Sequence, residues 1–322
     1  MRKLGMLIVC AAVAAVVSGC GSGGGDAAKP ADGQAPDGAK EKVIGAALLT
    51  QTHIFYQDMI AEMREEAARH GFKLKTQFAE FDSRRQNDQM EMFIAQGVDA
   101  IILAPTDSSG ITPVVADARA KDIPVFTADI AAKGADVVCH IASDNYKGGK
   151  ILAEFLVKQL NGQGKIAIVD HPSVTSVQDR TAGFTDEIAK SPGIQIVARV
   201  PGEGQRDKAL RVTQDLLQAN PDLAAIFGIN DDSALGALAA VEAAGLQDKI
   251  IIVGFDGTPE AADAIRAGKA LKADAVQFPK EIGKATIQTI ADHFDGVELP
   301  KERPVDVGLI TKESLEGAAA GG

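Results

Sequence analysis

Residues 223–260 have the sequence LAAIFGINDDSALGALAAVEAAGLQDKIIIVGFDGTPE. Two short apolar runs in it, at 223–227 and 250–253, are typical of buried strands. Between them, NDDS at 230–233 supplies residues that cap a helix, an alanine- and leucine-rich helix follows, and Gly245 provides its C-terminal stop. The stretch therefore predicts a strand–helix–strand unit of a parallel sheet.

A short polar side chain follows each of these two strands, Asn230 after the first and Asp256 after the second. Open α/β sheets bind ligands at the edge where the carboxyl ends of the strands lie. A carboxylate and an amide each offer two hydrogen-bonding atoms in one plane, which suits a polyhydroxylated ligand. The alternative interpretation is structural: Asn230 caps a helix and Asp256 makes a turn.

The alternation of strand and helix runs through most of the chain. It begins at residue 43 and restarts after residue 143, so two α/β lobes with helices on both faces of parallel sheets are expected. The predicted strands are 43–49, 72–78, 100–104, 124–128 and 140–143, and then 165–169, 194–200, 223–227, 250–253 and 271–276.

Composition and charge exclude several classes of protein. The chain has 322 residues and a net charge of −11, which leaves room for two domains and argues against nucleic-acid binding. Phosphate-loop, G-x-S-x-G and H-E-x-x-H motifs are absent, and the histidines lack metal-ligand spacing. Asp170 and His171 lie near Ser173, but sequence neighbours rarely form a catalytic triad. The sequence therefore predicts a protein without enzymatic activity, metal or cofactor.

The N-terminal segment predicts export. Residues 1–19 combine a basic pair with an apolar run at 4–17 that is too short for a permanent membrane span. Val17-Ser18-Gly19-Cys20 resembles the lipobox of bacterial lipoproteins, which implies cleavage before Cys20 and attachment of a diacylglycerol to its thiol. The alternative is an ordinary signal peptide with an incidental cysteine. Residues 20–42, rich in Gly, Ala and Pro, are predicted to be a flexible tether.

Three segments resemble type I periplasmic sugar-binding proteins of the ribose-binding group, which are ABC transporter substrate-binding proteins. They are INDDSALGALAAVEAAG at 229–245, IIVGFDGTPEAADAIRAGK at 251–269 and HIASDNYKGGK at 140–150. The resemblance implies two doubly wound parallel-sheet lobes joined by a hinge. The first lobe would comprise 43–143 plus 277–305, and the second 144–276 plus 306–315, with 316–322 as a disordered tail.

The same resemblance implies a sugar site. Phe55 and Tyr56 match two aromatic residues that sandwich the sugar ring, since aromatic faces suit the C–H side of a sugar. Arg180 matches an arginine that donates to the ring oxygen and hydroxyls. The alternatives are that Phe55 is a core residue of its helix and Arg180 a surface ion pair. The implied ligand-binding residues are His53, Phe55, Tyr56, Asp129, Arg180, Asn230, Asp256 and Gln277.

Two positions depart from the pattern of ribose binders. Ile130 stands where they have an arginine, and Gly204 stands where they have an aromatic residue. Arg206 is a candidate replacement for the missing cation. A pocket without these groups is roomier and less tuned to ribose, but it still suits a sugar or polyol.

The resemblance implies an extracytoplasmic substrate-binding lipoprotein that captures a monosaccharide, a pentose, hexose or related polyol, between two closing lobes. The partner would be an ABC permease and ATPase complex. The alternative is a sugar-sensing subunit that presents its ligand to a chemoreceptor or sensor kinase. In either case we expect an exported monomer, periplasmic or at the cell surface, that contacts the membrane only through its lipid anchor and binds no nucleic acid.

Overall fold

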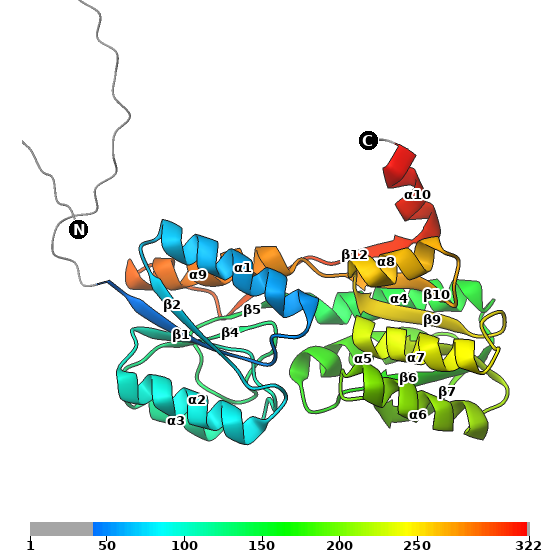
Figure 1. The fold of residues 1–322 in the computed structure, drawn as a ribbon, viewed down its shortest axis with the longest axis horizontal. Coiled ribbons are helices and arrows are strands. Elements are labelled where there is room, and N and C mark those ends of the chain that lie inside the picture. The colour runs from blue at the N-terminus through cyan, green and yellow to red at the C-terminus, as the bar shows by residue number, and fades with distance from the viewer. Residues whose placement is uncertain (1–40, 321–322) are drawn as a thin grey trace, which may run out of the picture. The chain divides into compact units, whose positions relative to one another are not determined.

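The computed structural model describes residues 41–320 (Figure 1). The predicted signal peptide, Cys20 and nearly all of the predicted tether lie outside the described residues. None of the helices in 41–320 combines the length and the apolar character needed to cross a membrane.

The first lobe is a six-stranded parallel sheet with helices on both faces (Figure 1). Its strands lie in the order β11-β5-β4-β3-β1-β2. Helices α1 (Ile54–Arg69) and α9 (Pro279–Phe294) cover one face, and α2 (Ser83–Gln96) and α3 (Thr112–Arg119) cover the other. The strands are β1 (Val43–Leu48), β2 (Lys73–Phe78), β3 (Ala100–Leu103), β4 (Val125–Ala128), β5 (His140–Ser143) and β11 (Glu302–Val305).

The second lobe repeats this architecture with strand order β12-β10-β9-β8-β6-β7. Only β12 is antiparallel to its neighbour among these six strands of the described chain. Helices α4 (Asn145–Gln159) and α5 (Thr175–Ile188) cover one face, and α6 (Arg206–Ala219), α7 (Asp231–Ala243) and α8 (Pro259–Arg266) the other. The strands are β6 (Gly164–Asp170), β7 (Ile194–Pro201), β8 (Leu223–Gly228), β9 (Ile251–Asp256), β10 (Leu271–Val276) and β12 (Gly308–Thr311).

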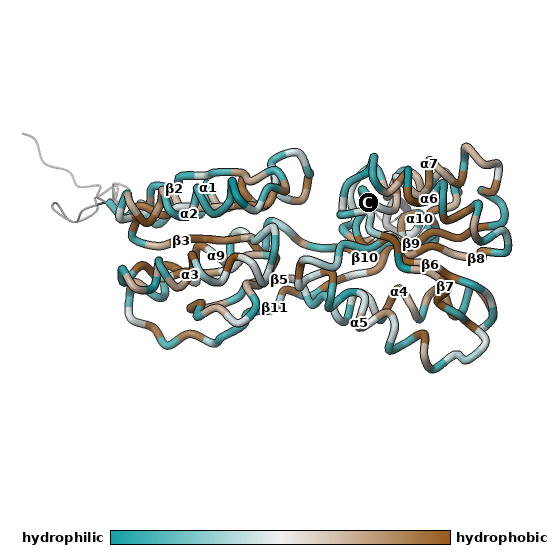
Figure 2. Tube along the Cα trace, turned by 90° about the horizontal axis from the view of Figure 1, so that it is seen from below, coloured by the Kyte–Doolittle hydropathy of each residue, from teal (hydrophilic) through white to brown (hydrophobic). Residues whose placement is uncertain are grey.

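The strands of both sheets supply much of the buried apolar core, and they appear as hydrophobic segments between more polar helices in Figure 2. All four residues of β3 are fully buried. The chain passes between the lobes three times, from β5 into α4, from β10 into α9, and from β11 into β12. The prediction of two α/β lobes with mostly parallel sheets is confirmed.

The C-terminal segment differs from the prediction. Residues 312–320 form α10 (Lys312–Ala320), so the disordered tail expected from residue 316 is wrong as far as residue 320. Thr311 and Ser314 cap this helix reciprocally, with Thr311 N donating to Ser314 Oγ at 2.9 Å and Ser314 N donating to Thr311 Oγ1 at 3.4 Å. The three alanines at 318–320 are strong helix formers.

Two glycines allow helices α4 and α5 to approach closely. A Cβ atom at Gly149 would overlap the backbone carbonyl of Arg180, and one at Gly183 would overlap the carbonyl of Tyr146. Only glycine fits such a contact between backbones. This close packing fixes the position of Arg180 on α5 relative to the start of α4.

Candidate functional site

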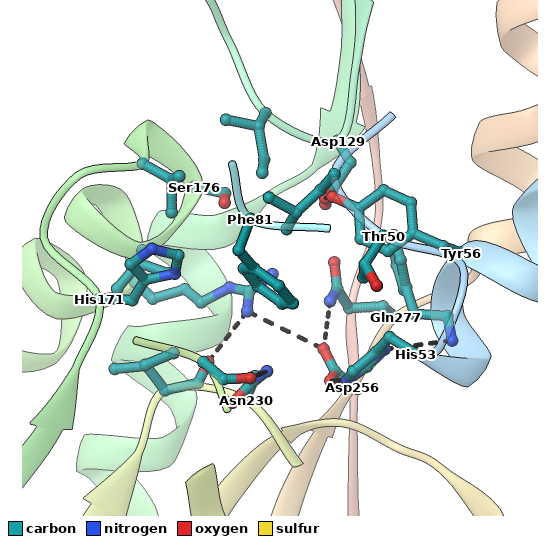
Figure 3. A pocket seen from close by; sticks show the side chains of 18 residues that line it. Thr50, His53, Tyr56, Phe81, Asp129, His171, Ser176, Asn230, Asp256 and Gln277 are labelled. Atoms are coloured by element: carbon teal, nitrogen blue, oxygen red, sulfur yellow. Dashed lines mark hydrogen bonds and ion pairs between the residues drawn. The ribbon is translucent and has the colours of Figure 1, made fainter. Parts of the chain in front are cut away.

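A cavity lies between the two lobes (Figure 3). It is bounded by the carboxyl ends of strands from both sheets, where α/β folds bind ligands. The structure brings all eight residues predicted from the resemblance to this cavity. They are His53, Phe55, Tyr56 and Asp129 from the first lobe, Arg180, Asn230 and Asp256 from the second, and Gln277 at the crossing after β10.

The first-lobe wall is largely aromatic. The rings of Phe55 and Tyr56 meet edge to face with centroids 5.4 Å apart, and both side chains are buried. Phe55 therefore belongs to the core and to the cavity lining at the same time. The Tyr56 hydroxyl donates to Asp129 Oδ2 at 2.6 Å, while Asp129 Oδ1 is buried without a hydrogen-bond partner in residues 41–320. Burial raises the pKa of Asp129 to about 6, although the Arg180 charge opposes this shift.

The second-lobe wall is polar and rigidly held. Arg180 is only 4% exposed, so the alternative of a surface ion pair is wrong. Its Nε donates to Asn145 Oδ1 at 2.8 Å, and its Nη1 donates to the carbonyl of Ile229 at 2.9 Å. The guanidinium carbon lies 3.8 Å from the centroid of the Phe255 ring, a cation–π contact. These contacts orient the arginine before any ligand arrives.

Asp256 connects the polar groups of the cavity. Gln277 Nε2 donates to its Oδ1 at 2.6 Å, and the backbone N–H of Asp231 donates to its Oδ2 at 3.2 Å. Arg180 Nη1 lies 3.9 Å from Oδ1. Burial raises the pKa of Asp256, but the hydrogen bond and charge of His53, with the charge of Arg180, outweigh burial and hold that pKa below its ordinary value. The carboxylate is therefore ionised at neutral pH.

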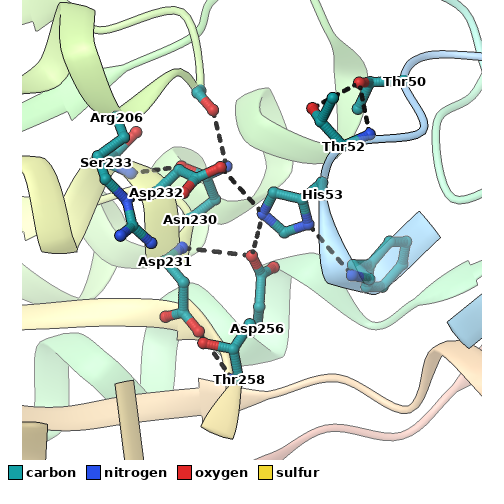
Figure 4. Close-up of polar contacts among 12 residues, drawn as sticks. Thr50, Thr52, His53, Arg206, Asn230, Asp231, Asp232, Ser233, Asp256 and Thr258 are labelled. Carbon is teal, nitrogen blue, oxygen red and sulfur yellow. Dashed lines mark hydrogen bonds and ion pairs between the residues drawn. The ribbon is translucent and has the colours of Figure 1, made fainter. Parts of the chain in front are cut away.

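His53 joins the two lobes electrostatically (Figure 4). It is the N-cap of α1, and its Nε2 lies 3.3 Å from Asp256 Oδ2 and 3.7 Å from Asp232 Oδ2 in the second lobe. Burial lowers the pKa of His53, but the hydrogen bond and charge of Asp256 exceed that effect and raise the pKa to about 9. The imidazole is therefore protonated at neutral pH and forms a cross-lobe ion pair.

Asn230 has both of the roles weighed from the sequence. Its Oδ1 accepts from Ser233 N at 2.9 Å and so caps α7, and its Nδ2 donates to the carbonyl of Gly204 at 3.2 Å. The side chain still lines the cavity. Asp256 was expected in a loop but is the last residue of β9.

A pair of buried carboxyl groups lies beneath Asp256. Asp231 and Asp274 are at most 1% exposed, and Asp231 Oδ1 and Asp274 Oδ2 are both buried without a hydrogen-bond donor in residues 41–320. Asp231 Oδ2 accepts from Thr258 N at 2.7 Å and Asp274 Oδ1 from Gly257 N at 3.0 Å, which fixes the two residues after Asp256. Burial, followed by the charge of Asp231, raises the pKa of Asp274 well above its ordinary value, so the two carboxyls share a proton.

Backbone strain concentrates around the cavity. Among residues 41–320, seven non-glycine residues have positive φ, and Asp129 (68°) and Asp256 (143°) are two of them. Phe81 (63°) lines the same cavity, and Glu80 (52°) and Glu203 (54°) directly precede the lining residues Phe81 and Gly204. Such conformations cost about 1–3 kcal/mol each and persist where packing enforces them, commonly at functional sites.

Several cavity residues were not predicted as ligand residues. Thr50, Phe81 and His171 line the cavity, and each follows a strand at the carboxyl edge of its sheet. The expectation that ligands bind at the carboxyl ends of the strands, applied to every strand, would have indicated these three residues. The suggestion that Arg206 replaces a missing cation is wrong, because Arg206 pairs with Glu260 at 2.7 Å and Asp232 at 3.1 Å, outside the cavity lining.

Two α/β lobes with a polar and aromatic cavity between their sheet edges define a type I periplasmic binding protein. Residues 44–298 match the family model described as the periplasmic binding protein domain, and the chain belongs to this family of sugar-binding ABC transporter substrate-binding proteins.

Particular relatives place the chain close to ribose binders. It is 35% identical to the ribose import binding protein of Bacillus subtilis, over 85% of this chain and 88% of that protein. It is 32% identical to the ribose import binding protein of Escherichia coli, over 97% of this chain and 99% of that protein. A solved ABC transporter solute binding protein from Bacillus halodurans, with bound myo-inositol, superposes with a TM-score of 0.80 at 29% identity, covering 87% of this chain and 98% of that one. These relatives are binding proteins and not enzymes.

Proposed function

We propose that the chain is an extracytoplasmic lipoprotein that captures a monosaccharide or related polyol between its lobes and delivers it to an ABC importer. The observation that carries this proposal is the composition of the interlobe cavity. Eight residues with the right chemistry for a polyhydroxylated ring come from both lobes and line one cavity.

Unpaired acceptors in the cavity favour a ligand rich in hydroxyl groups. Asp129 Oδ1 and Gln277 Oε1 are buried without a hydrogen-bond partner in residues 41–320, and both residues line the cavity. Buried acceptors without a donor are costly, and a ligand hydroxyl supplies the missing proton. Phe55 and Tyr56 offer apolar faces to the C–H side of the same ring.

The class of ligand follows from the relatives and from the departures at two positions. The matched relatives are ribose import proteins and a protein holding myo-inositol, so pentoses, hexoses and cyclic or linear polyols all enter the proposal. Ile130 and Gly204 remove a cation and an aromatic ring from the ribose-binder pattern, which favours a ligand other than ribose itself.

Contacts across the lobes support capture by closure. Thr175 N donates to Ser108 Oγ at 3.0 Å, and Ala131 N donates to Thr175 Oγ1 at 3.0 Å, in addition to the His53–Asp256 ion pair. A ligand that touches both lobes binds the closed form more tightly than the open form and shifts the population toward closure. The closed form then presents a surface made of both lobes to the transporter.

A thermal-shift screen tests the binding function. D-ribose, D-allose, D-xylose, D-glucose, xylitol and myo-inositol would be compared, because a ligand at 100 times its Kd adds about 2.7 kcal/mol to stability. We expect at least one of them to raise Tm by several degrees. No shift with any pentose, hexose or polyol at millimolar concentration would contradict the proposal.

The lipid anchor is tested separately. Cys20→Ala should move the protein out of the detergent phase in a phase-partitioning assay, because the acylated thiol is lost. Cys10→Ala, a cysteine of the leader outside the lipobox, serves as the matched control and should still partition with the detergent. Unchanged partitioning of Cys20→Ala would contradict acylation at this residue.

A further inference from the structure

Two rings from opposite lobes meet at the edge of the cavity. Phe81 lies in the loop between β2 and α2 of the first lobe, and His171 follows β6 of the second. Their ring centroids are 6.5 Å apart, and both side chains face the cavity (Figure 3). His171 is only 6% exposed, whereas Phe81 is half-buried.

These rings separate the cavity from a second hollow. An outer groove is lined by Ser83, Thr106 and Asp107 of the first lobe and by Glu203 and Lys208 of the second. In the described part of the chain, Phe81 and His171 are the two residues that line both the cavity and this groove. Their rings are therefore the wall between the enclosed site and the outside.

The loop that carries Phe81 is held in a strained conformation. Glu80 and Phe81 are consecutive non-glycine residues in the left-handed region, with φ of 52° and 63°. The Glu80 carboxylate clamps this turn to the end of β1, since it accepts from Thr50 Oγ1 at 2.6 Å and from Gln51 N at 3.1 Å. A bulky residue adopts this conformation only where the surroundings enforce it, so the ring position is built into the loop.

Gly204 leaves room for the second ring. A Cβ atom at this position would lie 3.3 Å from His171 Nδ1 and 3.5 Å from Asn230 Nδ2, and the backbone φ of 64° favours glycine. A larger side chain at residue 204 would therefore press on His171. The glycine at position 204, where ribose binders have an aromatic residue, therefore allows His171 to take its place beside the cavity.

We propose that Phe81 and His171 form a cross-lobe gate, which closes the cavity over its ligand and limits ligand size. This inference rests on the proposed function, because it assigns these residues a role at the same sugar site. Since each lobe supplies one ring, the gate is complete only when the lobes are closed. Removing the Phe81 ring would join the cavity to the outer groove and admit a substituent on the sugar.

A cross-linking experiment tests the gate with and without the sugar that gives the largest thermal shift, because the gate is complete only in the closed form. Phe81→Cys combined with His171→Cys should be linked by a short bifunctional thiol reagent in the mature chain, where Cys139 is fully buried. Phe78→Cys combined with His171→Cys is the control, since Phe78 on β2 lines neither hollow, and it should not be linked. Equal linking of both pairs, or no link between positions 81 and 171 in either condition, would overturn the gate.

A binding experiment tests selectivity. Phe81→Ala and the control Phe78→Ala would be titrated with D-ribose, D-allose, myo-inositol, and the methyl glycosides of the two sugars. We expect Phe81→Ala to raise the dissociation rate about ten-fold, the value of one aromatic contact, and to gain affinity for methyl glycosides relative to the parent sugars.

Phe78→Ala should leave the dissociation rate and the size selectivity within two-fold of wild type. Equal effects of the two variants would mean that Phe81 is only a packing residue and would overturn the inference. If the 81–171 link forms but wild-type protein binds none of the probes, the gate stands and the proposed sugar function fails.

Discussion

The two walls of the cavity differ in chemistry and in how they are held. The first lobe presents mainly ring and aliphatic surfaces from Phe55, Tyr56, Phe81 and Ile130. The second lobe presents an arginine and a carboxylate whose contacts are largely satisfied within that lobe and at its crossing. The difference suggests a division of roles: the second lobe orients the sugar through preformed hydrogen bonds, and the first lobe closes over it.

The largest expected effect is on the second-lobe side. Asp256→Ala removes the carboxylate that joins Gln277, His53 and Arg180, so ligand hydroxyls and two buried cations lose their partner. We expect Kd to rise at least 100-fold, about 3 kcal/mol, by isothermal titration calorimetry. Asp263→Ala, an exposed acid on α8, is the matched control and should bind within two-fold of wild type. Unaltered affinity in Asp256→Ala would place the ligand elsewhere.

The second prediction concerns pH and the contact between the lobes. The pKa of His53 is about 9 where it meets Asp256, above its ordinary value of 6.5. The ion pair is therefore fully present below pH 6.5, and its contribution to closure is lost as pH rises through 9. We expect sugar affinity to fall about ten-fold between pH 7 and pH 9, because protonation is linked to closure.

The control for this pH effect is His53→Asn, which retains a polar side chain that does not titrate. Its affinity should be lower at pH 7 and nearly constant to pH 9. An equally steep fall in this variant would show that another group titrates.

The third prediction concerns the carboxyl pair that supports Asp256. The pKa of Asp274 is raised in the folded protein, so the folded state keeps a proton that the unfolded chain releases above pH 4. Stability should therefore decline as pH rises from about 4 toward the raised pKa. Asp274→Asn replaces the shared proton by an amide donor, and we expect it to be more stable than wild type at pH 7 by at least about 1 kcal/mol in urea unfolding. A variant that is destabilised equally at pH 5 and pH 7 would contradict proton sharing.

The smallest effect is expected on the first-lobe side. Phe55→Leu keeps an apolar side chain but loses the ring face, so affinity should fall by about 1 kcal/mol, roughly five-fold. A loss as large as that of Asp256→Ala, measured by the same calorimetry, would remove the proposed difference between the two walls.

Local sequence patterns predicted most of the fold and much of the cavity lining. Strand–helix alternation located ten strands, and the strand-end rule with the family resemblance indicated eight residues that the structure brings together. The strands β11 and β12 escaped because β12 follows β11 without an intervening helix, so the alternation of strand and helix does not mark them. The contact of the eight cavity residues with a ligand is the proposal that the variants above test.

Other features depend on tertiary contacts that no local pattern encodes. Asp274 lies within the strand LKADAV, and only the packing of β10 beside β9 brings its carboxyl to Asp231. The meeting of Phe81 with His171 likewise joins residues 90 positions apart on different lobes, and the pairing of Arg206 with Glu260 depends on how α6 and α8 are placed.

Solution scattering tests the central claim of two-lobe capture most directly. The radius of gyration of the wild-type protein would be measured with and without the sugar that gives the largest thermal shift. We expect it to decrease on binding, because a ligand held by both walls favours the closed form, and we expect a smaller decrease in Asp256→Ala at a saturating sugar concentration. A sugar that binds tightly but leaves the scattering curve unchanged would contradict capture by closure.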